Sequence, residues 1–390
     1  MRLIRTRLVL VASLASVVVL AGVLLGLDTE RQRSHTPQSG TSDTSLRSME
    51  AVLRRDGLDA ALDSLERRAA RDSAVLRDGH QMAHALGRDA VALHGGDASI
   101  IRECRPSFAS GCYHGVVEAA VRHAGRIDMA QLERLCVSMD GPGGPAPGFE
   151  CLHGLGHGVL GAVDRDLATT LRHCDALSTA RRVASCHSGA FMEAITGALG
   201  PPMTHEMHTH VADQAHAVAR PLAIDPADPY SPCDAYHDPY ATSCWLFQGY
   251  VILRANAFDA GRALRVCDGA PDGRAARCYE SIGHQLTGLF QRGDAWMLGE
   301  CAKGNPVLAA RCAGGATLAL NATDWSGRRA ARFCAAAPPA WKDECYRSAA
   351  GALVDLATPE QRASLCAAVE VEYIASCREA GEVERGIVAR

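Results

Sequence analysis

The sequence predicts an all-α fold, a solenoid or ring of about nine helical hairpins, eight of them closed by a disulfide. Its 16 cysteines form eight consecutive pairs, and the second cysteine of each pair recurs at intervals of 39, 35, 58, 34, 34, 33 and 32 residues. A period near 33–34 residues is typical of stacked helical hairpins. Aromatic residues make up only 5% of the chain, which favours closely packed helices over a β-sandwich.

The residues around Cys334 and Cys345 show how one repeat is expected to form. Residues 307–322 are a good helical run, DWSG makes a turn, and RRAARFC is a short second helix that ends at Cys334. The prolines of AAAPPAW end that helix, and the next long helix carries Cys345. Eleven residues along one unbroken helix would separate the two Cα atoms by about 16 Å, far beyond the reach of a disulfide. The chain must therefore reverse between the two cysteines.

The cysteine pairs are expected to be disulfides rather than zinc ligands. Zinc sites usually contain cysteines two to four residues apart, and the sequence has no such knuckle. An even cysteine count behind an export signal also favours disulfides, each contributing about 3 kcal/mol to stability. The expected pairs are Cys104–Cys112, Cys136–Cys151, Cys174–Cys186, Cys233–Cys244, Cys267–Cys278, Cys301–Cys312, Cys334–Cys345 and Cys366–Cys377.

The first 27 residues are predicted to be a signal-anchor that spans the membrane. Three arginines precede an apolar run over residues 8–27, which is long enough to span roughly 30 Å. The positive flank places the N-terminus in the cytoplasm. A cleaved signal peptide is the alternative, although no convincing A-x-A cleavage site follows. Residues 28–45 are expected to be a polar linker, and residues 46–390 an extracytoplasmic helical repeat domain.

Two parts of the repeat domain depart from the regular pattern. Residues 46–102 contain no cysteine but carry two amphipathic stretches, so they are expected to form a first hairpin without a disulfide. The 58-residue interval holds one repeat and an insertion at about residues 200–230, whose prolines indicate a loop. This loop is either a lid over the other histidines or an ordinary exposed loop. It carries a second histidine cluster of His205, His208, His210 and His216.

Histidine and glutamate recur on the long helices four residues apart. Aligned on the second cysteine, CYHGVVE, CLHGLGH and CYESIGH place them two and six positions after it. Residues four apart share a helix face, and equivalent positions of neighbouring repeats stack. Such pairs can assemble a site for a divalent transition metal, and zinc, iron, copper and manganese are all compatible. The expected ligands are His80, His84, His114, Glu118, His153 and His157, with His187, Glu193 and His284 as second candidates.

Three glycines fall three residues after a cysteine on these helices: Gly115, Gly154 and Gly189. They are expected to let a neighbouring helix approach closely, which is a packing role.

The alternative is that these histidines are ordinary polar residues or relics of repeat duplication. Their distribution favours a site, because 14 of the 16 histidines lie in the first 216 residues and none follows His284. The cysteine scaffold nevertheless continues to Cys377. We therefore expect a site in one part of the array, with capping repeats beyond it.

The disulfide-paired repeats over residues 104–377 resemble the cysteine-rich Sel1-like repeat proteins of bacteria. Those proteins also combine an export signal with stacked helix pairs that are each closed by a disulfide. The resemblance implies a helical solenoid and covers architecture only. The paired cysteines of that family lie closer together than the C-x10-C spacing found here, and the family is not known for stacked His/Glu pairs.

Two functions follow from these features. The first is a membrane-anchored, extracytoplasmic metal-binding protein, which could be a metalloenzyme with an open coordination position. The second is a non-catalytic protein–protein interaction scaffold of the cell envelope, with an envelope protein or peptidoglycan-side partner. The formal net charge of −4 argues against nucleic acid as a partner, whereas residues 8–27 imply contact with the membrane.

Overall fold

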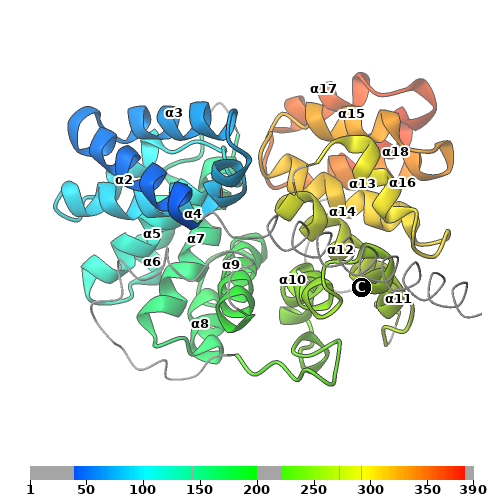
Figure 1. Cartoon of the computed structure of the whole chain (residues 1–390), viewed down its shortest axis with the longest axis horizontal. Coiled ribbons are helices and arrows are strands. Elements are labelled where there is room, and N and C mark those ends of the chain that lie inside the picture. Colours follow the sequence, from blue (N-terminus) through cyan, green and yellow to red (C-terminus); the bar gives the residue numbers. More distant parts are fainter. Residues whose placement is uncertain (1–38, 142–143, 200–221, 272, 291, 383–390) are drawn as a thin grey trace, which may run out of the picture. The chain divides into compact units, whose positions relative to one another are not determined.

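The computed structural model describes residues 39–382, apart from residues 142–143, 200–221, 272 and 291 (Figure 1). The predicted signal-anchor lies outside the described residues. Contacts divide the chain into residues 1–43 and residues 44–390, and α3 to α18 all belong to the second unit. Helix α2 (Ser39–Asp56) begins inside the segment expected to be a polar linker. Among the helices described, none is long and apolar enough to cross a membrane.

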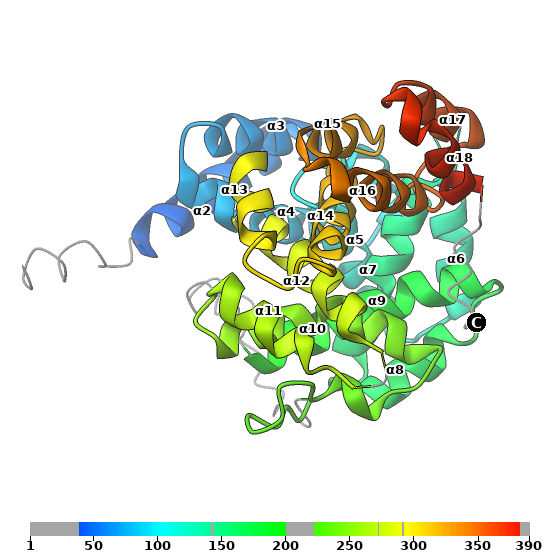
Figure 2. The same ribbon diagram turned by 90° about the vertical axis from the view of Figure 1, so that its right-hand side faces the viewer.

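All regular secondary structure among the described residues is helical, apart from one isolated β-bridge, which confirms the all-α prediction. Each repeat ends in a helix that packs on the next repeat. These helices are α4 (Ser73–Leu93), α5 (Gly111–Ala124), α7 (Ala146–Ala162), α9 (Ala180–Leu199), α10 (Tyr240–Ala255), α12 (Ala275–Phe290), α14 (Ala309–Asn321), α16 (Pro339–Ala352) and α18 (Ile374–Glu382). Each contacts the next one in this order, as the views of Figures 1 and 2 show for most of the array.

Another helix precedes most of these helices and, except before α18, is the shorter of the two. The short helices are α3 (Leu58–Ala69), α6 (Met129–Val137), α8 (Leu167–Cys174), α11 (Ala260–Asp268), α13 (Asp294–Cys301), α15 (Arg328–Ala336) and α17 (Pro359–Ala367). Aspartates cap several of them: the side chains of Asp128, Asp166 and Asp259 each accept a hydrogen bond from a backbone N–H in the first turn of α6, α8 and α11. Such caps satisfy donors that the helix leaves free.

Two repeats differ from the expectation that the first cysteine ends a short α-helix. Cys104 follows the 3₁₀ turn η1 (Ala98–Glu103), and Cys233 begins the 3₁₀ turn η3 (Cys233–Ala235). Three prolines at positions 226, 229 and 232 explain the second case, because proline removes the N–H groups that an α-helix needs. A third 3₁₀ turn, η4 (Val371–Tyr373), precedes α18.

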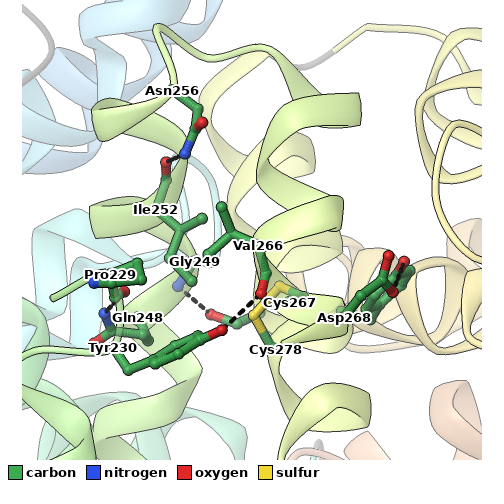
Figure 3. Close-up of a disulfide and its surroundings, with 12 residues drawn as sticks. Pro229, Tyr230, Gln248, Gly249, Ile252, Asn256, Val266, Cys267, Asp268 and Cys278 are labelled. Atoms are coloured by element: carbon green, nitrogen blue, oxygen red, sulfur yellow. Dashed lines mark hydrogen bonds between the residues drawn. A yellow bond between two sulfur atoms is a disulfide. The ribbon is translucent and has the colours of Figure 1, made fainter. Parts of the chain in front are cut away.

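All 16 cysteines form the eight predicted disulfides, with Cα–Cα separations between 5.3 and 5.6 Å. Figure 3 shows how Cys267 at the end of α11 meets Cys278 near the start of α12. Beside it, the Tyr230 hydroxyl donates to the Val266 carbonyl at 2.8 Å, which fixes the proline-rich segment against α11. Disulfides of this number indicate an oxidising environment.

The segment that follows α16 packs against helices α7 and α9 of the first half of the array. Ala146 at the start of α7 is buried in one cluster with Leu353 and Leu356, which follow α16. Arg181 of α9 forms an ion pair of 2.7 Å with Asp355. The segment that follows α16 therefore packs against the repeats of α7 and α9.

Candidate metal centre

Five histidines from three neighbouring helices gather at one place. His80 and His84 come from α4, His114 from α5, and His153 and His157 from α7. The ring of His114 lies 5.4 Å from His80, 5.8 Å from His84, 4.8 Å from His153 and 4.9 Å from His157, measured between centroids. The stacked i, i+4 pairs thus converge, as the sequence predicted.

Three of these imidazoles can hold a metal ion: His114, His153 and His157 each offer a nitrogen, and the three nitrogens lie within 4.8 Å of one another. A tetrahedral ion with bonds of about 2.1 Å holds its ligand atoms about 3.4 Å apart. Small rotations of the imidazole rings would close the difference. His114 and His157 are almost completely buried, with 2% and 4% of their surfaces exposed.

Hydrogen bonds fix the orientation of the rings through Nδ1. His153 Nδ1 lies 2.7 Å from Ser188 Oγ. Ser188 donates its own proton to the Ser185 carbonyl at 2.9 Å, so it must accept from His153 Nδ1–H. His157 Nδ1 lies 3.2 Å from Glu193 Oε2, and a carboxylate can only accept. Both rings therefore carry the proton on Nδ1 and keep the lone pair on Nε2, which is the usual arrangement around a metal-binding histidine.

His80 is oriented in the same way by a left-handed turn before α5. Its Nδ1 donates to the carbonyl of Phe108 at 2.8 Å. Phe108, Ala109 and Ser110 all have positive φ, between 49° and 62°, which L-residues seldom adopt. Strain of this kind is concentrated at functional sites. The turn leaves the Nε2 lone pair of His80 available beside His114.

Several buried ring nitrogens at the centre have no hydrogen-bond partner. These are both nitrogens of His114 and Nε2 of His157, within the part of the chain that the structure describes. A buried polar atom without a partner costs about 1–3 kcal/mol. A bound cation would engage one nitrogen of each ring and so remove part of this cost.

Burial favours the neutral form of four of the five imidazoles. It lowers the pKa of His80 and lowers the pKa values of His84, His114 and His153 well below their usual range, and protonation of one ring further disfavours protonation of the next. Neutral imidazole is the form that binds metal. The cluster therefore suits metal binding at neutral pH.

Arginines engage two carboxylates of the cluster. Glu118 lies 3.1 Å from Arg88 and 3.2 Å from Arg122. Glu193 lies 3.1 Å from Arg165. Burial alone would raise the pKa of Glu193, but His157 and Arg165 outweigh it and lower the pKa to about 2. Both glutamates thus stand behind the histidines, held by ion pairs.

Arg88 also changes the role of His84. Its guanidinium lies 2.7 Å from His84 Nδ1, and arginine can only donate, so this nitrogen accepts and the proton sits on Nε2. His84 is part of the cluster, but in this arrangement it has no free lone pair for an ion.

His187 lies apart from the five histidines. Its Nε2 contacts Asp175 at 2.9 Å, and its ring packs 5.0 Å from Tyr240. It directly follows the second cysteine of its repeat, the position that Tyr279 occupies in a later repeat, where the hydroxyl donates to Asp268 at 2.8 Å. His187 thus ties its hairpin together in place of a tyrosine.

His284 on α12 also stays outside the ring contacts of the cluster. Its Nδ1 accepts from Gln285 at 3.0 Å, and its ring packs edge-on against Phe247 at 6.1 Å. It lies near enough to lower the pKa of His153 slightly, as a minor cause. The insertion histidines His205, His208, His210 and His216 lie outside the described residues.

The predicted glycine contacts explain how the helices come so close. A Cβ at Gly115 would lie 1.9 Å from the carbonyl oxygen of His84, and one at Gly154 would lie 2.8 Å from the Cα of His114. Only glycine permits these approaches. The prediction of a packing role is confirmed.

One buried carboxyl group escaped the sequence analysis. Glu150 on α7 is 7% exposed, and its Oε2 lies 3.6 Å from Nε2 of His114. It stands directly before Cys151 and outside the two aligned positions, so the repeat pattern did not mark it. The sequence feature that could have marked Glu150 is its position as a charged residue near the start of an otherwise apolar and glycine-rich helix.

Comparison with known proteins gives no assignment. No family model, curated protein or solved structure matches the chain.

Proposed function

We propose that this protein is a membrane-anchored, extracytoplasmic metal-binding protein whose ion is held by His114, His153 and His157. One observation carries the proposal: three imidazole nitrogens from two helices lie within 4.8 Å of one another. The unpartnered nitrogens of His114 and His157 support it, because an ordinary buried histidine would have a hydrogen-bond partner.

The ligand set narrows the choice of ion. Imidazole suits zinc, copper, iron and nickel, and carboxylates at the site widen the range to manganese. Three histidines leave at least one coordination position for a further ligand, as in catalytic zinc sites. His80 lies next to one of the three ligands, with its ring centroid 5.4 Å from that of His114 and its Nδ1 bonded to Phe108.

The location rests on two features outside the site. Eight disulfides support a location in an oxidising compartment outside the cytoplasm. The apolar run of residues 8–27 after basic residues is long enough to anchor the repeats there.

Metal content tests the proposal. The full chain would be produced in an oxidising compartment, extracted with detergent and examined by elemental analysis, before and after reconstitution. The test variant is His153→Ala/His157→Ala, and the matched control is His94→Ala/His237→Ala, which removes two exposed histidines.

Stoichiometric metal is expected in the parent and the control, and its loss is expected in a folded test variant. Absence of metal from the reconstituted parent would overturn the proposal. In that case the envelope scaffold becomes the better hypothesis, and the search turns to protein partners.

A further inference from the structure

Glu150 is a buried acid without a cation to balance it. Among the described residues, the titratable group recorded within ion-pair distance of Glu150 is the imidazole of His114, which is neutral at neutral pH. Glu118 and Glu193 differ, because arginines contact both. A buried carboxylate without a counter-charge is costly, so such groups are rare unless something neutralises them.

The distance between Glu150 and His114 is too long for a hydrogen bond. Oε2 and Nε2 lie 3.6 Å apart, whereas hydrogen bonds of this type measure about 2.7–3.2 Å. Two metal bonds of about 2.1 Å that meet at 110–120° place their ligand atoms about 3.4–3.6 Å apart. The spacing therefore suits two ligands of one ion.

The imidazole on the other side of this gap lacks a hydrogen-bond partner. His114 is 2% exposed, and neither of its nitrogens has a hydrogen-bond partner within the described part of the chain. An acid and a base therefore face each other in a dry environment without bonding.

We propose that Glu150 is the fourth protein ligand, so that three imidazoles and one carboxylate hold the ion. This inference rests on the proposed function. The carboxylate oxygen would share the ion with Nε2 of His114, and its flexible side chain would swing toward His153 and His157 on binding. The ion supplies the missing positive charge.

An anionic oxygen ligand changes which ions the site prefers. Carboxylate favours hard ions such as manganese and ferrous iron, whereas a purely imidazole site favours zinc and copper. The carboxylate also offsets one of the two charges of a divalent ion inside the protein. The site should therefore bind manganese more tightly than a site built from the three imidazoles alone.

The test compares two glutamates of the same cluster in the full chain. Glu150→Gln removes the proposed ligand charge at nearly constant volume, and Glu118→Gln is the matched control because arginines already engage Glu118. Binding of Mn²⁺ and Zn²⁺ is measured by competition with a chelating dye. The visible spectrum of bound Co²⁺ reports the ligand set.

Glu150→Gln should weaken Mn²⁺ binding by more than about 100-fold, because loss of a ligand exceeds the 10–100-fold effect of an outer-shell change. The affinity for Zn²⁺ should fall by a smaller factor, and the visible spectrum of bound Co²⁺ should change. Glu118→Gln should keep the parent spectrum and an affinity within a few-fold. Glu150→Asp keeps the carboxylate and should recover part of the loss, which guards against a misfolded Gln variant.

Two results would overturn the inference while leaving the proposed function intact. One is a parent that binds metal together with a Glu150→Gln variant of unchanged affinity and spectrum. The other is an equal loss in Glu118→Gln. A parent that binds no metal would instead reject the proposed function itself.

Discussion

Gly189 of α9 packs directly against the carbonyl oxygen of His153 on α7, so closely that a Cβ at residue 189 would lie 1.8 Å from that oxygen. The same contact holds Ser188 and Glu193 in place to orient His153 and His157. The close packing of α9 on α7 therefore also sets the orientation of the two histidine rings.

Gly189→Ala should therefore destabilise the protein by about 2–3 kcal/mol, because backbone atoms cannot move aside as a flexible side chain can. The variant should also bind metal more weakly, since α9 must shift. Urea unfolding and metal titration check both effects. Gly161→Ala is the control, because nothing lies within 4 Å of a Cβ at that exposed position of α7. It should be neutral or stabilising by up to about 1 kcal/mol, and equal losses in the two variants would contradict the packing argument.

Much of this interface could be predicted from the sequence. The cysteine period placed the long helices side by side, and the four-residue spacing put His153 and His157 on one face. Glu150 and Arg88 could not be predicted, because their roles depend on which neighbour each side chain reaches. The contact between Arg181 and Asp355 joins residues 174 positions apart, and nothing local to either residue indicates it.

Acid should destabilise the metal-free protein partly through His284. Burial lowers the pKa of His284 from about 6.5 to about 4. The unfolded chain therefore binds more protons than the folded one between these values, and stability falls as the pH drops through this window. The contribution amounts to about 2 kcal/mol at pH 5.

Urea unfolding with a chelator present tests this effect. Between pH 7.5 and pH 5 the parent should lose about 2 kcal/mol more than His284→Gln. His94→Gln, at an exposed position, should follow the parent. Parallel pH profiles for the parent and His284→Gln would show that His284 is not neutral in the folded state.

His187→Ala should lower stability without removing the metal. The side chain is fully buried and bonds Asp175 at 2.9 Å, so its loss should cost about 2 kcal/mol. Metal content should stay at the parent level, because this ring lies outside the five-histidine cluster. Loss of metal from a folded His187→Ala protein would place His187 among the ligands, contrary to its position here.

The closing contact should stabilise the repeats more than a local ion pair of the same chemistry. Arg181 on α9 bonds both the side chain and the backbone carbonyl of Asp355, which follows α16, four repeats later, and is 15% exposed. A double-mutant cycle on Arg181→Ala and Asp355→Ala should give a coupling of about 1 kcal/mol. The control pair, Arg347 and Asp343, lies within one helix at 3.0 Å and should couple by only about 0.3–0.5 kcal/mol. If the array were open in solution, Arg181 and Asp355 would not meet and their coupling would vanish, while the control pair would keep its own.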